Sequence, residues 1–207
     1  MMRPVLTATD LAGVAEGGEL TIAVGTLVTP LARDEAARRG ITLRVAESPS
    51  AARPDQHPIA IGSDHGGYEL KEHLKTLLRD WGYPVDDRGT DSSTAAVDYP
   101  DFAESVASSV AHGEAWRGII IDSAGIGSSI AANKVPGARA ALCYDRATAR
   151  NSREHNDANV LSLGARLISP ETAREIVAVW LETPFAGGRH QKRVDKITGI
   201  EQRHRKV

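Results

Sequence analysis

An aspartate–histidine pair, Asp64 and His65, follows a short apolar run and precedes two glycines, Gly66 and Gly67. A carboxylate beside an imidazole can move protons, and glycines let the backbone approach a ligand closely. The same residues can instead form an ordinary polar turn in which Asp64 caps the next helix. The pair alone therefore indicates acid–base chemistry only as one of two alternatives.

A second candidate begins at Asp122, which ends a strongly apolar run and is followed by the small residues of segment 123–129. The backbone N–H groups of Ser123 to Gly127, including Gly125, can face an anion at the start of a helix. The segment lacks the Lys-Ser/Thr pair of a nucleotide phosphate loop and the third glycine of a dinucleotide loop. A tight turn without a ligand is the alternative.

Two further polar segments lie near the C-terminus. His155 and Asn156 open a stretch of polar side chains before an apolar run. Arg189 and Arg193 are four residues apart, so a helix would place both guanidinium groups on one face, where they suit a phosphate. A hydrophilic loop and a solvated basic helix end are the alternatives for these two segments.

Short apolar runs alternate with helical periodicity over most of the chain, which predicts βαβ units. We expect an α/β fold with a five-stranded, doubly wound parallel sheet of Rossmann-like type, in which ligands bind at the carboxyl ends of the strands. The expected strands are 59–62, 84–89, 118–122, 138–143 and 159–163. The expected helices are 68–81, 101–112, 128–134, 145–154, 170–182 and 191–204.

The chain divides near residue 55. Residues 47–58 are rich in Pro, Ser and Ala and predict a linker between an N-terminal extension, 1–46, and the main domain, 59–207. Within the extension we expect a strand over 20–28, a helix over 29–40 with Thr29 as its N-cap, and a strand over 41–45.

Composition excludes several classes of function. The net charge is −2, which gives no reason to expect nucleic-acid or membrane binding, and no apolar run approaches the length of a membrane helix. One cysteine, Cys143, permits no intramolecular disulfide, and the start of the chain does not resemble a signal peptide. We therefore expect a cytoplasmic protein.

Taken together and in order, the polar segments resemble the ribose-5-phosphate isomerase type B and galactose-6-phosphate isomerase family. The resemblance covers about residues 58–202 and is carried by the segments 62–67, 98–100, 125–127, 130–134, 152–161, 164–166 and 187–194. It implies an aldose–ketose isomerase that uses an enediolate and neither a metal nor an organic cofactor. Ribose 5-phosphate is the expected substrate, with a tetrose or hexose phosphate, or a non-catalytic sugar-phosphate-binding scaffold, as alternatives.

The resemblance also implies roles for individual residues. His155 would assist opening of the sugar ring, and Asp64 would handle a hydroxyl proton. The phosphate would be held by His65, Arg189 and Arg193, with Arg166 as a further candidate. Tyr99 and Asn156 would line the sugar site, and the N–H groups from Ser123 through Gly125 to Gly127 would stabilise the enediolate. Family members share active sites across a dimer, so a homodimer or a dimer of dimers is expected.

The sequence departs from the family at the base. Asp122 stands where many members have a cysteine, and Ser128 stands where another branch has a glutamate. Asp122 is therefore either the base or a residue with another role, such as binding a hydroxyl group or capping the loop. The single cysteine, Cys143, lies in the next expected strand and is not a candidate base.

The extension carries a second, separate resemblance. Residues 20–46 resemble the short Thr-Pro-x-Ala-Arg-Asp segments of proteins from bacterial microcompartment operons. This resemblance implies docking on a shell or cargo protein, and hence a location inside a microcompartment. The alternative is an arm that docks on its own sheet or on the dimer partner.

Overall fold

The computed structural model describes residues 5–22, 26–45 and 57–204. The chain forms two compact units, residues 1–52 and 53–207. The linker expected at 47–58 lies almost entirely outside the described residues. No helix in the described part of the chain is long and apolar enough to cross a membrane.

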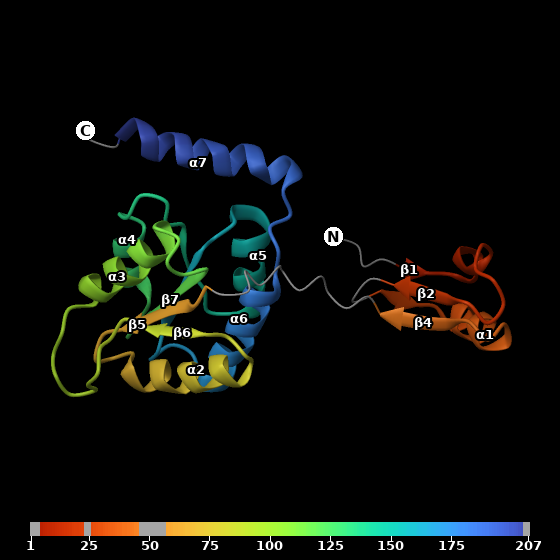
Figure 1. Cartoon of the computed structure of the whole chain (residues 1–207), viewed down its shortest axis with the longest axis horizontal. Helices are drawn as coiled ribbons and strands as arrows, with labels where there is room; N and C mark the ends of the chain where they lie inside the picture. The colour runs from red at the N-terminus through yellow and green to blue at the C-terminus, as the bar shows by residue number, and fades with distance from the viewer. Residues whose placement is uncertain (1–4, 23–25, 46–56, 205–207) are drawn as a thin grey trace. The chain divides into compact units, whose positions relative to one another are not determined.

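The larger unit is built on a five-stranded parallel sheet, as predicted (Figure 1). Its strands are β5 (Ile59–Ser63), β6 (Val85–Asp87), β7 (Arg117–Asp122), β8 (Ala140–Leu142) and β9 (Val160–Gly164), and their spatial order is β6-β5-β7-β9-β8. Every residue of β5, β7 and β9 is buried, which explains their continuous apolar runs, because helices cover both faces of a parallel sheet.

The helices divide between the two faces of this sheet. One face packs against α2 (Tyr68–Asp80), α5 (Arg146–Asn156) and α6 (Pro170–Glu182), and the other against α3 (Tyr99–Ala111) and α4 (Ile126–Ala132). The first of these layers is centred on Leu74, Leu78 and Trp180, and the second on Val106 and Ile120, all fully buried. This arrangement confirms the doubly wound α/β fold.

Helix boundaries differ from the prediction by a few residues where turn chemistry decides. Helix α4 begins at Ile126 instead of 128, because Gly125, with φ of +79°, ends the preceding loop directly before it. Helix α3 begins at Tyr99 instead of 101, since Pro100 fits the first turn of a helix. Helix α6 begins as predicted, with the Ser169 hydroxyl group accepting from the Thr172 N–H at 3.2 Å.

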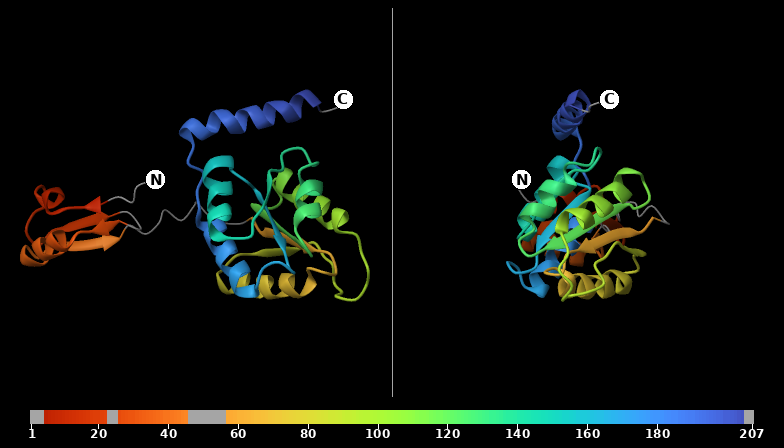
Figure 2. Two further views of the ribbon diagram at one scale, coloured as in Figure 1. Left: turned by 180° about the vertical axis from the view of Figure 1, so that it is seen from behind. Right: turned by 90° about the vertical axis from the view of Figure 1, so that its left-hand side faces the viewer.

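A 3₁₀ turn, η2 (Gly188–His190), leads into the C-terminal helix α7 (Gln191–His204). Helix α7 lies along one side of the unit, outside the layers that cover the sheet (Figure 2). Its Val194 is buried, and Glu201 accepts a hydrogen bond from the Gly137 N–H at 3.0 Å. Ile197 and Ile200 of the same helix are exposed.

The smaller unit contains β1 (Val5–Leu6), η1 (Ala8–Leu11), β2 (Glu19–Ile22), β3 (Leu27–Val28), α1 (Pro30–Arg38) and β4 (Thr42–Val45). Two parallel strand pairs, β1-β3 and β2-β4, enclose a small core that includes Leu11 and Ala32. Thr29 caps α1 as predicted. The single strand expected over 20–28 is wrong, because β2 and β3 pair with different partners; β1 and η1 were not predicted.

Candidate active site

The end of β5 places Asp64 and His65 at the carboxyl edge of the sheet. Asp64 is 7% exposed, and its Oδ1 accepts from the Gly67 N–H at 2.9 Å. No residue in the described ranges hydrogen-bonds to its Oδ2. His65 is exposed, and its Nδ1 accepts from the Val97 N–H at 3.4 Å, which ties it to the segment before α3. Asp64 therefore caps its turn with one oxygen, and its other oxygen has no protein partner among the described residues.

Asp122, at the end of the neighbouring strand β7, is 5% exposed and fully engaged. Its Oδ1 accepts from the N–H groups of Ala124, at 2.7 Å, and Gly125. Its Oδ2 accepts from Ser128 twice, from the N–H at 3.0 Å and from the hydroxyl group at 2.5 Å. A carboxylate has about four acceptor positions, so these four donors saturate it.

These contacts alter the anion-binding loop that the sequence predicted over Ser123 to Gly127. Two of its five N–H groups, those of Ala124 and Gly125, already bind the side chain of Asp122. Within the described ranges, the N–H groups of Ser123, Ile126 and Gly127 have no protein acceptor. The loop thus binds the Asp122 side chain with two of its N–H groups, and the other three have no acceptor in the described part of the chain.

Glycines allow the other predicted residues to approach this loop. A β-carbon on Gly127 would lie 2.4 Å from Cζ of Tyr99, and one on Gly66 would lie 2.5 Å from the Ser123 hydroxyl oxygen. Larger residues at either position would push these groups apart. Arg166 is exposed and follows β9, and its N–H donates to the Ser123 carbonyl at 3.0 Å. The structure therefore brings Asp64, Tyr99, Ser123 and Arg166 together around the Asp122 loop.

A second cluster forms around His155, at the end of α5. Its ring stacks on that of His190, with 4.1 Å between ring centroids and 6° between planes. The Arg189 Nε donates to His190 Nε2 at 3.3 Å, and the Arg193 guanidinium donates to the Arg189 carbonyl at 3.2 Å. Asn156 is exposed at the same helix end. This cluster collects His155, which the resemblance assigned to ring opening, and two of the predicted phosphate ligands, Arg189 and Arg193, whereas His65 and Arg166 lie in the first cluster.

Basic side chains dominate the surface beside this cluster. An open hollow of about 600 Å³ is lined by Gly188, Arg189, Lys192, Arg193 and Lys196. The pKa of His190 lies below its ordinary value, because of partial burial and the nearby His155, Arg189 and Arg193. The four cationic side chains that line this hollow make it suitable for a phosphate group.

The two clusters lie at opposite edges of the sheet. Helix α5 connects the parallel strands β8 and β9, so it must run antiparallel to them, from the carboxyl edge back to the amino edge. His155, at its end, therefore lies away from Asp64 and Asp122. One chain does not bring the two groups of predicted residues together.

Four residues of these clusters were not identified from sequence as site residues. The first, Ser128, was noted for its position but not as the partner of Asp122. The second, His190, stacks on His155. The third is Tyr144, whose hydroxyl group donates to the Ala124 carbonyl at 2.9 Å. The fourth, Asn151, contacts His155 at the spacing i, i+4, which is a signal that the sequence offered. Nothing in the sequence indicated Tyr144.

Cys143 lies apart from these contacts in the buried layer. It is 1% exposed, and burial raises the pKa of its thiol, although side-chain contacts with Ser152 and Thr148 act in the opposite direction. A thiol in this environment is a poor nucleophile and a poor base. The structure agrees with its exclusion from the candidate bases.

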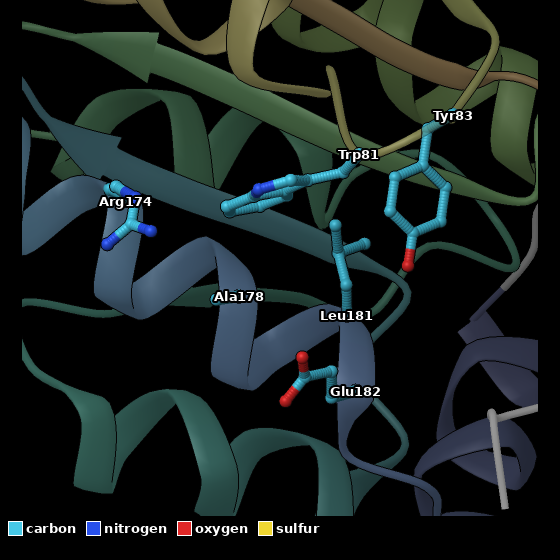
Figure 3. Close-up of a pocket in the computed structure, with 6 residues that line it drawn as sticks. All are labelled: Trp81, Tyr83, Arg174, Ala178, Leu181 and Glu182. Carbon is cyan, nitrogen blue, oxygen red and sulfur yellow. The ribbon is translucent and has the colours of Figure 1, made fainter. Parts of the chain in front are cut away.

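A separate pocket of about 340 Å³ lies between α6 and the segment after α2. Trp81 and Tyr83 face Arg174, Leu181 and Glu182 there (Figure 3). Tyr83 precedes β6 and Leu181 is near the end of α6, so the pocket lies at the amino edge of the sheet. In the described part of the chain, no three His, Cys, Asp or Glu side chains are grouped as metal ligands.

Comparison with known proteins matches this unit over nearly its whole length. The sequence pattern of the Ribose/Galactose Isomerase family matches residues 59–197. Ribose-5-phosphate isomerase B of Escherichia coli is 49% identical over 145 residues, which are 70% of this chain and 97% of that protein. D-erythrulose-4-phosphate isomerase of Pectobacterium atrosepticum is 40% identical over 147 residues, 71% of this chain and 97% of that protein.

A solved structure resembles this chain both in sequence and in fold. Ribose-5-phosphate isomerase B of Clostridium thermocellum superimposes with a TM-score of 0.70 at 53% identity, and it covers 72% of this chain and 99% of its own. These relatives are matched almost completely, whereas about 30% of the present chain lies outside the match.

Proposed function

Because the chain belongs to the Ribose/Galactose Isomerase family and is a sugar phosphate isomerase, we propose that it interconverts ribose 5-phosphate and ribulose 5-phosphate. The observation that carries the proposal is the loop at the end of β7, in which the N–H groups of Ser123, Ile126 and Gly127 have no acceptor among the described residues. Asp64 Oδ2, which also has no partner among those residues, lies at the same end of the sheet. Such N–H donors can stabilise an enediolate oxygen.

The reaction requires three steps. Ring opening breaks the bond between C1 and the ring oxygen, and the C1 hydroxyl proton is in effect transferred to that oxygen. A base then removes the proton from C2, which gives the enediolate, and returns it to C1, while the C2 hydroxyl proton passes to the oxygen on C1. His155 is the residue proposed for the first step, and Arg189, Arg193 and His65 are proposed to hold the phosphate.

For the base, the hydrogen bonds favour the alternative in which Asp122 has another role. Its four acceptor positions are occupied by loop donors, and a carboxylate must free one of them before it can take a proton. Asp64 is also a buried carboxylate at this edge, and no group in the described ranges donates to its Oδ2. We therefore assign the base to Asp64 and assign Asp122 to bracing the loop.

A complete site needs the two clusters from different chains, since α5 separates them within one chain. We propose a homodimer in which the carboxyl edge of one protomer faces the His155 cluster of its partner. Apolar side chains suited to such a contact are exposed on α4 and α7, namely Ile126, Ile130, Ile197 and Ile200.

The substrate and the base are tested together. The purified protein is incubated with ribose 5-phosphate in D₂O, and both ribulose 5-phosphate and deuterium at C2 are measured. We expect turnover in the wild type, loss of C2 exchange in Asp64→Asn, and retained exchange in Asp122→Asn. If C2 exchange is lost in Asp122→Asn and retained in Asp64→Asn, Asp122 is the base. If the wild type acts only on erythrose 4-phosphate or a hexose phosphate, ribose 5-phosphate is not the substrate.

The N-terminal unit is proposed to act outside catalysis, as a docking module for a microcompartment shell or cargo protein. It has its own small core, and Leu31 of α1 is 69% exposed. Deleting residues 1–55 is expected to leave turnover unchanged. A fusion of residues 1–46 to a fluorescent protein should become punctate in cells that form microcompartments, whereas a Leu31→Asp fusion should stay diffuse. A diffuse wild-type fusion would contradict the docking role.

A further inference from the structure

His155 is held on two sides by residues of its own chain. Asn151 lies one helical turn earlier on α5, and its amide nitrogen Nδ2 is 2.8 Å from His155 Nδ1. The His190 ring covers one face of the imidazole. The edge that carries Nε2 is therefore the edge through which His155 can meet a ligand.

We propose that Asn151 is a positioning residue that fixes the tautomer of His155. An amide nitrogen donates hydrogen bonds and does not accept them, so His155 Nδ1 must be the acceptor in this pair. A neutral imidazole that accepts at Nδ1 carries its proton on Nε2. Asn151 thus presents His155 to the sugar as a hydrogen-bond donor.

The His190 ring, which stacks on His155, also favours a neutral His155. Arg189 Nε donates to His190 Nε2, so this nitrogen is an acceptor, and Arg189 and Arg193 place positive charge beside the stack. Glu154 is the acidic neighbour that acts in the opposite direction. Two stacked imidazolium rings would repel each other, whereas two neutral rings stack favourably.

The tautomer decides how His155 takes part in ring opening, and in this respect the inference rests on the proposed function. With its proton on Nε2, His155 donates a hydrogen bond to the ring oxygen as the bond between C1 and that oxygen breaks. The C1 hydroxyl proton passes through a water molecule to the ring oxygen, while His155 stabilises that oxygen by its hydrogen bond and keeps its own proton, so the proton balance closes. With the opposite tautomer, Nε2 would accept from the C1 hydroxyl group instead.

The tautomer is measured directly by ¹⁵N NMR of the histidine side chains in the full-length protein, with His155 assigned through a His155→Gln variant. We expect a protonated Nε2 in the wild type. Asn151→Asp should move the proton to Nδ1, because a carboxylate accepts there, and Asn151→Leu should remove the preference. Arg150→Leu, at an exposed position of the same helix, is the control. A wild-type His155 with its proton on Nδ1 would overturn the proposal.

A second measurement separates ring opening from the rest of catalysis. Erythrose 4-phosphate cannot form a furanose, because its C4 oxygen carries the phosphate. Asn151→Leu should lower kcat on ribose 5-phosphate roughly 10-fold with little change in KM, and leave kcat on erythrose 4-phosphate unchanged. Equal losses on both substrates would contradict a role in ring opening. If the wild type uses neither substrate, the proposed function fails, and the NMR measurement still tests the role of Asn151.

Discussion

Ser128 donates two hydrogen bonds to the same oxygen of Asp122, one from its backbone N–H at 3.0 Å and one from its hydroxyl group at 2.5 Å. These residues occupy the two positions at which the family resemblance predicted a base. Here they bind each other across the loop. We infer that this pair stabilises the loop, and the inference makes a prediction about stability.

Asp122→Asn should lower the free energy of unfolding by roughly 1–3 kcal/mol, because its amide group would place donors against the donors of Ser128. Ser128→Ala removes only the hydroxyl hydrogen bond, so a smaller loss of about 1 kcal/mol is expected. Urea unfolding followed by circular dichroism measures both values. An Asp122→Asn protein as stable as the wild type would show that the loop does not depend on this carboxylate.

Two inactive variants should restore activity when they form mixed dimers. Asp64→Asn damages the carboxyl-edge cluster and His155→Gln damages the other cluster. Random pairing of the two variants gives heterodimers in which one of two sites is intact, so about one quarter of wild-type activity should return. Co-expression with different affinity tags supplies the mixed dimers. If purified heterodimers stay inactive, the clusters do not combine across chains.

The thiol of Cys143 should resist alkylation in the native protein. It is 1% exposed, and burial raises its pKa, so little thiolate is available to react. Iodoacetamide is expected to leave activity unchanged over a period in which the urea-unfolded chain is fully labelled, as measured by mass spectrometry. Rapid inactivation that parallels labelling at Cys143 would place the thiol in or near the site.

Asp87 should contribute to the pH dependence of stability. Burial alone would raise its pKa, but hydrogen bonds from Lys71, Lys75 and the Gly89 N–H hold the pKa below its ordinary value. The folded state therefore binds fewer protons here than the unfolded chain. The contribution is present above the unfolded pKa, about 3.9, and is lost as the pH falls through the folded value.

Asp87→Asn should accordingly lower the free energy of unfolding at pH 7. Below pH 5 this free energy should then decrease less steeply in the variant than in the wild type. Urea midpoints measured across this range test the prediction, with the exposed Asp80→Asn as the control. If the urea midpoints of the wild type and Asp87→Asn change in parallel with pH, the contacts of Asp87 with Lys71 and Lys75 do not make folding depend on pH.

The sequence predicted the layers of the fold well, because apolar runs such as 118–122 report burial on both faces of a sheet. It also singled out most of the polar residues that form the two clusters, although it did not divide them into two groups. It did not predict that Asp122 would be saturated, because that depends on a left-handed turn at Gly125 that folds four donors around one side chain. The separation of His155 from Asp64 could have been predicted from the sequence, because a helix that connects two parallel strands must return to their amino ends.

The length of α5 has a consequence for the behaviour of the protein at low concentration. At 1.5 Å per residue, a helix of eleven residues places its ends about 16 Å apart, beyond the reach of a single pentose phosphate. An isolated protomer would then bind the phosphate group of the substrate without isomerising the sugar. If the proposed homodimer completes the site, dilution below its dissociation constant should abolish activity without unfolding the protein, and specific activity should rise with total protein concentration instead of staying constant.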